Sequence, residues 1–562
     1  MTTHVVSRKL LRPIGRNTVA LAALSAALLV AAACSTVLAA EPASAPAIIG
    51  DEPTIKVHFS QAAIDAGEVS LESLVAQGRL LFTAQFNTLD GAGRPETTGV
   101  GDSPFRERRE FPDNFNRISG PDAGSCAACH SQPLIGGAGD NVTNIFVDAE
   151  IHPFANFDGG EGDAFKIDLT LETVGPERNS VSLFGSGLIE MLSREMSFEL
   201  HGIRDAALKQ ARETGTDVTR SLVTKDVDFG TIIVRPDGSI DSSGVEGVDS
   251  DLIIKPFHQK GAVVSLREFA VKGMNNHHGM QPTERFRDGV DADGDGVVNE
   301  LTRGDLTAIV AFMVSLPTPG RVMPTDPAAF AAAEHGEELF ATLNCIQCHR
   351  TTLRLDSPVF TEPNPFNPPG KLKLSDVSQP LSISLTGASA GDLTLEPDGS
   401  LLVPAFTDLK RHDMGPALDT DAVRQNGIPT EMWLTRKLWG VASEAPFLHH
   451  GRATLISEAI LLHGGEAEQQ RLEYAALAPD DQAAVVEFIK TLQILTPGDD
   501  QQGVGAASLA ADDGPGTALL SVIGGVVGGA ILLLLATVAL SLARRRRGAL
   551  SLSGRVREFR PH

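Results

Sequence analysis

Apolar residues at helical spacing define two pairs of similar segments along this chain. The sequences GRLLF at residues 78–82 and GEELF at 336–340 each place a glycine and a phenylalanine four positions apart, on one helical face. Farther along, AIVAFMVSL at 308–316 and AVVEFIKTL at 484–492 are apolar helical patterns that each end before a proline. Because both patterns occur twice and in the same order, we predict two units that share one helical repeat.

The paired segments set the expected domain boundaries. We predict a first domain at residues 70–320 and a second at 328–497, with a linker around 317–327. Two further runs, TIIVRPDGSI at 231–240 and LTLEPDGSLLV at 393–403, carry β-prone residues on both sides of a Pro-Asp-Gly turn signal. The expected fold class is therefore mainly α, with small β-hairpin insertions.

The N-terminus has the layout of a secretory signal peptide, which we expect over residues 1–45. Basic residues are followed by an apolar run at 19–33 and then by small residues. Cleavage after Ala40 or Ala45 fits this pattern, and cleavage before Cys34 with lipid attachment is the alternative. Either route predicts export of the chain.

A second apolar segment, at residues 517–543, carries no charge and is long enough to cross a ~30 Å hydrocarbon layer as a helix. The arginines at 544–547 orient its C-terminal end toward the cytoplasm. We predict a flexible tether at 498–516, one transmembrane helix at 517–543 and a cytoplasmic tail at 544–562. The expected location is the cytoplasmic membrane, with both domains on the periplasmic or other extracytoplasmic side. A buried soluble helix is the alternative.

The charge balance narrows the class of partner. Acidic residues outnumber basic ones by 71 to 47, and the formal net charge is -24. Binding to phosphates needs a clustered basic surface, so we expect no nucleic-acid partner. A basic protein partner stays open.

Each of the two units contains one Cys-x-x-Cys-His motif. The motif residues are Cys126, Cys129 and His130 in the first unit, and Cys345, Cys348 and His349 in the second. In such a motif the cysteines form thioethers to haem and the histidine binds the iron. We therefore predict two covalently bound haem c groups. A disulfide within each pair, a redox-active dithiol or a shared zinc site are the alternatives.

Three further segments carry a resemblance to a known family. They are residues 125–137, which contain the first motif followed by Gln132-Pro133 and Gly136-Gly137, residues 276–281 (NHHGMQ), and residues 438–453, which run from LWG to PFLHHGRA. Together with both motifs they make residues 70–497 resemble the bacterial di-haem cytochrome c peroxidase superfamily, in particular its di-haem oxidoreductase (or thiol oxidoreductase) branch. The resemblance implies two cytochrome c-like domains.

The resemblance also implies an axial ligand for the second haem. In these peroxidases that ligand lies fourteen residues after the first histidine of a Pro-aromatic-x-His segment, which places His463 there, fourteen residues beyond His449. Relatives carry methionine at this position, so a histidine is expected to lower the potential of this haem. His412 and Met414 are the competing candidates. Trp439 is the candidate for packing beside the second haem or relaying an electron.

For the first haem the resemblance implies a reactive distal side. A peroxide-reducing site needs a distal group that moves a proton between the peroxide oxygens. Glu190, His277 and His278 are the candidates. The alternatives are a salt bridge at a helix terminus for Glu190 and a structural hydrogen bond for one of the two histidines.

An acidic loop has the spacing of a calcium site. The candidate oxygen ligands are Asp291, Asp293, Asp295 and Asn299. Gly296 at the sixth position suits an EF-hand loop, but Thr302 occupies the twelfth position in place of the usual glutamate. Glu300 or Asp305 could substitute. A solvated acidic turn is the alternative.

The expected function is that of a peroxidase-like oxidoreductase. Electrons would enter at the second haem from a redox donor protein or a quinol-linked cytochrome, and pass to the first haem, where peroxide or another small oxidant is reduced. An electron-transfer cytochrome without its own substrate and a di-haem oxygenase, like the rubber-cleaving enzymes, are the alternatives. A thiol substrate has no support, because the mature chain is left without a spare cysteine.

Overall fold

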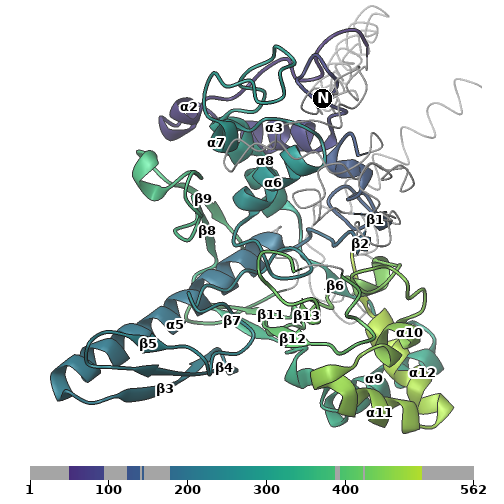
Figure 1. Cartoon of the computed structure of the whole chain (residues 1–562). Coiled ribbons are helices and arrows are strands. Elements are labelled where there is room, and N and C mark those ends of the chain that lie inside the picture. The colour runs from purple at the N-terminus through teal and green to yellow at the C-terminus, as the bar shows by residue number, and fades with distance from the viewer. Residues whose placement is uncertain are drawn as a thin grey trace, which may run out of the picture. The chain divides into compact units, whose positions relative to one another are not determined.

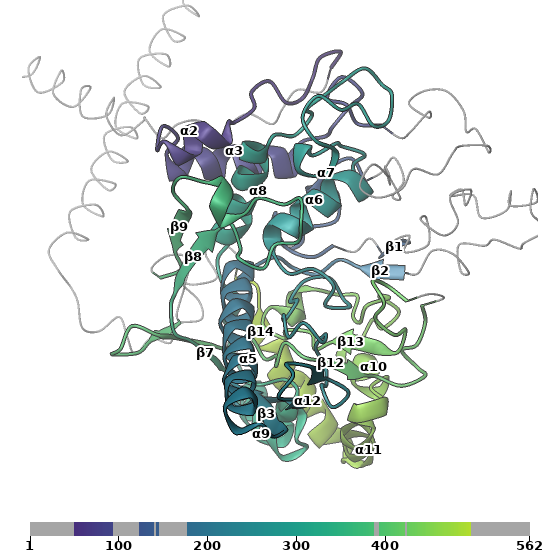
Figure 2. The ribbon, with the colours of Figure 1, turned by 60° about the vertical axis from the view of Figure 1, so that its left-hand side comes forward.

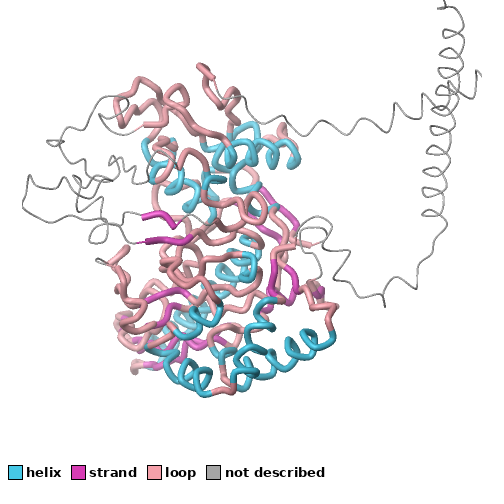
Figure 3. The backbone as a smooth tube through the Cα atoms, turned by 90° about the vertical axis from the view of Figure 1, so that its right-hand side faces the viewer, coloured by secondary structure: helices cyan, strands magenta, loops and turns pink. Residues whose placement is uncertain are grey.

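The computed structural model describes residues 50–93, 123–139, 142–144, 177–386, 393–421 and 424–495. Helices account for 35% of this part of the chain and strands for 15% (Figure 1). The expectation of a mainly α fold is therefore wrong. Figure 3 shows loops and turns between most of the short elements, because the long connections between helices satisfy their backbone groups locally, in small antiparallel sheets.

The helices of the described chain vary in length from one turn to eight turns. Their bounds are α2 (Gln61–Asp65), α3 (Leu71–Thr83), α5 (Ser186–Thr214), α6 (Leu266–Asn276), α7 (Thr283–Phe286), α8 (Arg303–Ser315), α9 (Pro327–Thr342), α10 (Ile456–Leu461), α11 (Glu468–Ala476) and α12 (Pro479–Lys490). Short 3-10 turns carry the two motifs: η1 (Cys126–Ala128) and η3 (Cys345–Gln347).

The strands pair in sheets of two or three, and each described pair is antiparallel. Their bounds are β1 (Val142–Asn144), β2 (Glu177–Asn179), β3 (Val218–Thr224), β4 (Val227–Val234), β5 (Ile240–Asp241), β6 (Gly320–Arg321), β7 (Leu353–Leu355), β8 (Val359–Glu362), β9 (Leu381–Ser384), β10 (Thr394–Leu395), β11 (Leu401–Val403), β12 (Arg411–Asp413), β13 (Met432–Leu434) and β14 (Leu492–Gln493). Both predicted Pro-Asp-Gly hairpins are present, as β4–β5 and β10–β11.

The predicted helical repeat is present as two close helix pairs, α3 with α8 and α9 with α12. A methyl group added at Gly78 would lie 1.9 Å from the carbonyl oxygen of Ala308, and one added at Gly336 would lie 1.8 Å from that of Ala484. Each glycine therefore marks the point where two helix backbones meet. The phenylalanine four residues later packs on its partner helix in both pairs, with ring centroids 5.1 and 5.3 Å apart.

We expect Gly336→Ala to destabilise the second helix pair. The added methyl group cannot fit against the Ala484 carbonyl without moving α9 away from α12, and overpacking of this kind costs about 1–3 kcal/mol. Thermal unfolding followed by circular dichroism measures the effect. Gly202→Ala in α5 is the control, because a methyl group there meets no atom within 4 Å and is expected to preserve or raise the melting temperature. Equal melting temperatures for the two variants would contradict the packing argument.

The long helix α5 connects the buried core to the β3–β4 hairpin. Its first three turns are buried, whereas its second half alternates buried alanines with exposed charged residues. Figure 2 shows β3 beside the end of this helix, where the two elements are in contact. A glycine in the left-handed conformation, Gly215, ends the helix before the hairpin begins.

None of the helices in the described part of the chain is both long and apolar enough to cross a membrane. Apolar α8 has 13 residues, whereas a span needs about 20, and α5 has 29 residues but is amphipathic. This finding contradicts the expected single-pass location in the cytoplasmic membrane. The segment at 517–543, on which that expectation rested, lies outside the described residues, together with 1–45, 498–516 and 544–562.

Candidate functional site

The first Cys-x-x-Cys-His motif is held in one tight turn. The Ser125 hydroxyl accepts a hydrogen bond from the Ala128 amide at 3.2 Å and caps η1. The amide of His130 then donates to the carbonyl of Cys126, which brings the histidine beside both cysteines. The ring Nδ1 of His130 donates to the Gly137 carbonyl at 3.1 Å, so the hydrogen bond leaves Nε2 as the free ligand atom. Burial lowers the pKa of His130 to about 4 and keeps the ring neutral.

A cavity of about 1150 Å³ adjoins this motif. Its lining includes Cys126, Cys129, His130, His258, His277 and His278. Cofactor and ligand cavities commonly measure ~300–1,000 Å³, so this one has room for a porphyrin and a further small molecule. Both cysteines and the histidine of the motif therefore line a space of suitable size for the predicted haem.

The second motif repeats the same local design. In η3 the amide of His349 donates to the carbonyl of Cys345 at 3.0 Å. The His349 Nδ1 donates to the Phe406 carbonyl at 3.1 Å, and burial lowers the pKa of this ring to about 4 as well. A cavity of about 350 Å³ adjoins the motif, and Cys345, Cys348 and His349 line it.

His463 faces His349 across the second cavity. Its Nδ1 donates to the carbonyl of Ala459 at 2.8 Å, which leaves Nε2 free, and burial lowers its pKa. The ring centroids of His349 and His463 lie 6.4 Å apart. The planes of the two rings are tilted by 58°. Both rings line the second cavity, so His463 is the residue placed to act as a second axial ligand beside His349.

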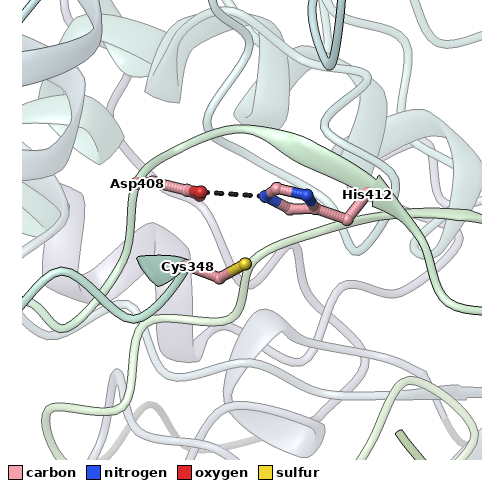
Figure 4. Close-up of side chains that lie close together, drawn as sticks. All are labelled: Cys348, Asp408 and His412. Carbon is pink, nitrogen blue, oxygen red and sulfur yellow. Dashed lines mark hydrogen bonds and ion pairs between the residues drawn. The ribbon is translucent and has the colours of Figure 1, made fainter. Parts of the chain in front are cut away.

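His412, the competing candidate, has both ring nitrogens engaged by carboxylates. Nε2 lies 2.8 Å from Asp408 and Nδ1 lies 2.7 Å from Glu466. Burial opposes charge on this ring, but the hydrogen bonds that the ring donates to Asp408, Cys348 and Glu466 outweigh it and raise the pKa of His412 to about 12. Figure 4 shows the His412–Asp408 pair beside the sulfur of Cys348. A protonated imidazole cannot bind iron, so this arrangement favours an ion pair at the edge of the second cavity.

Met414 also lines the second cavity, whereas Trp439 does not. The Trp439 ring is 2% exposed and packs against Gly185, where a methyl group would lie 2.5 Å from the ring. The tryptophan of the described cavity wall is Trp433, which stacks on His449 with ring centroids 3.4 Å apart. The candidate role in packing beside the second haem therefore fits Trp433, which the sequence analysis passed over.

Glu190 lies in a buried network away from the first cavity. One carboxylate oxygen accepts from the Leu266 amide at 2.8 Å, and the other accepts from the Asn364 side chain at 2.8 Å and pairs with Arg194. Glu190 does not belong to the described lining of that cavity. This placement favours the salt-bridge alternative, with Glu190 also capping the start of α6.

The adjacent histidines at the end of α6 point in different directions. Nδ1 of His278 donates to the carbonyl of Ala123 at 2.7 Å, and its Nε2 lies 3.4 Å from the sulfur of Cys126, so this ring braces the motif. His277 lines the first cavity, where burial first and the neighbouring His278 second lower its pKa to about 3. Of the three predicted distal candidates, His277 and His278 both line the first cavity, and Glu190 does not; the contacts of His278 with Ala123 and Cys126 give that ring a structural role, which leaves His277 as the distal candidate.

Sequence reasoning missed a further histidine of the same cavity, His258. Its ring lies edge to face with Phe269, at a centroid distance of 5.6 Å. The residues before it, Pro256 and Phe257, repeat the Pro446-Phe447 pair of the second unit. That repeated dipeptide was the available signal.

The two cavities share one wall. Residues that line both are Asn179, Gln259, Leu434, Thr435 and Arg436. The Leu434 amide donates to the Gln259 carbonyl at 3.1 Å, which ties the end of β13 to the loop of the first cavity. A single layer of residues thus separates the two candidate haem spaces.

The acidic loop brings three of its four predicted calcium ligands together. Ligand oxygens of Asp291, Asp293 and Asp295 lie within 4.8 Å of one another. One oxygen each of Asp293 and Asp295 is buried without a hydrogen-bond partner in the described chain. Burial first, then the Asp295 charge, raises the pKa of Asp293 to about 7. Asn299 instead accepts a hydrogen bond from the Gly289 amide.

Neither suggested substitute for the missing twelfth ligand joins these aspartates. Asp305 forms a capping box with Thr302 at the start of α8. Both oxygens of Glu300 accept hydrogen bonds from Gln281, and burial raises the pKa of Glu300 to about 9. Gln281 also donates to Asp293 at 3.0 Å, so it links the acidic loop to the segment that contains His277 and His278.

Comparison with known proteins finds a family match within the second unit. Residues 371–492 match the family model described as "Di-haem oxidoreductase, putative peroxidase". The match includes His463 and three residues of the shared cavity wall, Leu434, Thr435 and Arg436. Among solved structures, the chain is similar to hydrazine synthase of Kuenenia stuttgartiensis, with 13% identity over 53% of this chain and 92% of that one, at a TM-score of 0.24. At that score the likeness carries no argument about fold. No curated protein matches the sequence.

Proposed function

From the match of residues 371–492 to the di-haem oxidoreductase family model, we propose that this chain carries two covalent haem c groups and reduces peroxide. One observation carries the proposal. Both Cys-x-x-Cys-His turns tie the histidine Nδ1 to a backbone carbonyl and leave Nε2 free beside a cavity lined by the two cysteines. This arrangement meets the needs of thioether attachment and axial ligation together.

The two sites are suited to different tasks. In the second site His349 and His463 both line the cavity, with ring centroids 6.4 Å apart, and two axial imidazoles would close the iron there to other ligands, which suits electron relay. The first cavity is about 1150 Å³ against about 350 Å³ for the second and has room beyond the cofactor. When bound, haem supplies one-electron redox chemistry and an iron position for peroxide.

The shared wall supplies a direct route between the sites. Leu434, Thr435 and Arg436 contact both cavities, so an electron passing from the second site to the first crosses one layer of covalently linked residues. The donor would be a redox protein or a quinol-linked cytochrome that reaches the second site. Trp433, stacked on His449, belongs to the second site's side of the wall.

Spectroscopy on the purified protein tests this proposal. We expect a pyridine haemochrome assay to give two haems c per chain. Electron paramagnetic resonance of the half-reduced protein should show one low-spin iron with two nitrogen ligands and one iron that accepts azide. Fewer than two haems would overturn the cofactor assignment. Two irons that stay six-coordinate and low-spin in the presence of azide would overturn the enzymatic function and leave electron transfer alone.

We further propose calcium at Asp291, Asp293 and Asp295. The buried, unpartnered oxygens of Asp293 and Asp295 give a hard cation the ligands that it prefers, and their burial would cost stability without one. Through Gln281 the loop then supports the segment of His277 and His278.

Calcium is therefore expected to stabilise the protein. At a free concentration 100 times the dissociation constant, a cation bound only to the folded state adds ~2.7 kcal/mol. We expect the melting temperature to fall on addition of a calcium chelator and to recover with excess calcium, and Asp293→Asn should abolish this response. Asp237→Asn is the control, because Asp237 lies in an exposed turn of the β4–β5 hairpin. A melting temperature insensitive to calcium would refute the site.

A further inference from the structure

Each of the two units contains a loop of the same conformation, in addition to the repeated pair of helices. The Phe257 amide donates to the Val263 carbonyl at 3.2 Å, and the Phe447 amide donates to the Ala453 carbonyl at 2.7 Å. The residue after each phenylalanine has a left-handed backbone, with φ of 63° at His258 and 68° at Leu448. In both loops the acceptor lies six positions after the donor, so the two loops have the same conformation in the same register.

The register continues into the following helix. The carboxylate of Glu268 accepts from the Val264 amide at 2.9 Å, and that of Glu458 accepts from the Thr454 amide at 2.8 Å. Each glutamate lies eleven residues after its phenylalanine, and the spacing contains no insertion. Helices α6 and α10 therefore begin at equivalent positions.

In this register Gly273 takes the place of His463. Both residues lie sixteen positions after the phenylalanine of their own loop. Gly273 lines the first cavity, and a methyl group added to it would meet no atom within 4 Å. Where the second unit projects an imidazole toward the proximal histidine, the first unit has no side chain and has free space.

The same register places His258 opposite Leu448. His258 lines the first cavity, and its ring nitrogens have no hydrogen-bond partner among the described residues. Phe269, which its ring contacts, lies edge to face with His130 at a centroid distance of 6.2 Å. Burial lowers the pKa of His258 to about 3, so the ring is neutral and offers one donor and one acceptor nitrogen.

We infer that Gly273 leaves the sixth coordination position of the first haem to a small exogenous molecule, and that His258 is the catalytic residue that hydrogen-bonds to this molecule. The inference rests on the proposed di-haem function and adds the residues that define its reactive side. The first site therefore has His258 where the second has Leu448, and Gly273 where the second has His463.

With peroxide as the small molecule, His258 moves one proton. The acceptor nitrogen of His258 takes the proton from one peroxide oxygen and returns it to the other peroxide oxygen. The O–O bond then breaks with water as the leaving group. Two electrons from the donor protein, relayed through the second site, and two protons from solvent reduce the remaining oxygen to a second water. The sum is one peroxide, two electrons and two protons to two waters.

The Gly273→His variant tests the first half of the inference. We expect the new imidazole to fill the open position, so that the first iron becomes low-spin and azide binding, followed by optical titration, is lost. His463→Gly is the mirror variant and should open the second site to azide. If the wild type binds azide and Gly273→His binds it equally well, the register is wrong. If the wild type binds no azide at either site, the proposed function itself fails.

The His258→Leu variant tests the second half, because leucine is the residue of the equivalent position. We expect azide binding to persist and the rate of peroxide reduction, followed by stopped-flow spectroscopy of half-reduced protein, to fall ~10²–10⁴-fold. His335→Leu on exposed α9 is the control and should keep the wild-type rate. His277→Leu is the comparison within the cavity, and a larger loss there than in His258→Leu would overturn the assignment.

Discussion

Removal of both first-motif cysteines, in the variant Cys126→Ala with Cys129→Ala, is expected to leave one haem per chain and to abolish peroxide reduction. The two thiols line the larger cavity, and His130 alone would have to retain the porphyrin through a single iron–nitrogen bond. Because enzymes accelerate reactions ~10⁶-fold or more, loss of the reactive site should bring turnover to the uncatalysed level. Haemochrome content and peroxide consumption with a reducing dye measure both effects.

The matched variant, Cys345→Ala with Cys348→Ala, should also retain one haem but differ in behaviour. Its first site is intact, so azide should still bind there, while turnover that depends on electrons from the second site should stop. The two double variants thus separate the reactive site from the relay. Identical azide binding in both variants would contradict the division of tasks proposed for the two cavities.

The helical repeat could be predicted from sequence because its causes are local. Gly78 and Gly336 are the residues at which two helix backbones touch, and the phenylalanines four positions later follow from helical geometry. The two Pro-Asp-Gly hairpins likewise follow from turn chemistry. The fold class was wrong because the remaining small sheets pair segments without strong turn signals, such as β8 with β9 and β12 with β13.

Side-chain roles at the site were harder to predict, because they depend on which groups tertiary packing brings together. Glu190 in an apolar stretch suited either a catalytic or a structural role, and Arg194 four residues later was the unused sign of the ion pair found there. His258 had only the repeated Pro-Phe dipeptide before it as a sequence signal, and its place in the first cavity became visible when the two loops were compared in space. Trp433 and Trp439 are close in sequence, yet only Trp433 reaches the second cavity.

His463 was singled out through the family resemblance, by its spacing of fourteen residues from His449, and its role as an iron ligand stays a prediction. The structure adds the partner of Nδ1 and the facing ring of His349. Because of these two contacts, a substitution of His463 is expected to change the midpoint potential of the second haem, which can be measured.

Replacement of this ligand, in the variant His463→Met, is expected to raise the midpoint potential of the second haem. A thioether stabilises reduced iron relative to a second imidazole, and axial ligands shift haem potentials within a range of ~0.8 V, so an increase on the order of 0.1 V or more is expected. The unbranched side chain of methionine fits the space beside Ala459 without a new buried polar group. Potentiometric titration followed in the optical spectrum measures the shift, and loss of the low-spin signal with two nitrogen ligands accompanies it.

Leu461→Met, at the end of the short helix α10 that precedes His463, is the control for this substitution. Leu461 is exposed, so methionine there changes the helix surface while both axial imidazoles stay in place. An unchanged potential in His463→Met, with the two-nitrogen signal retained, would mean that another residue binds the second iron. His412 would be a poor replacement, because both of its nitrogens are bound to carboxylates and its pKa is raised to about 12. Met414, which lines the same cavity, would then be the ligand to test next.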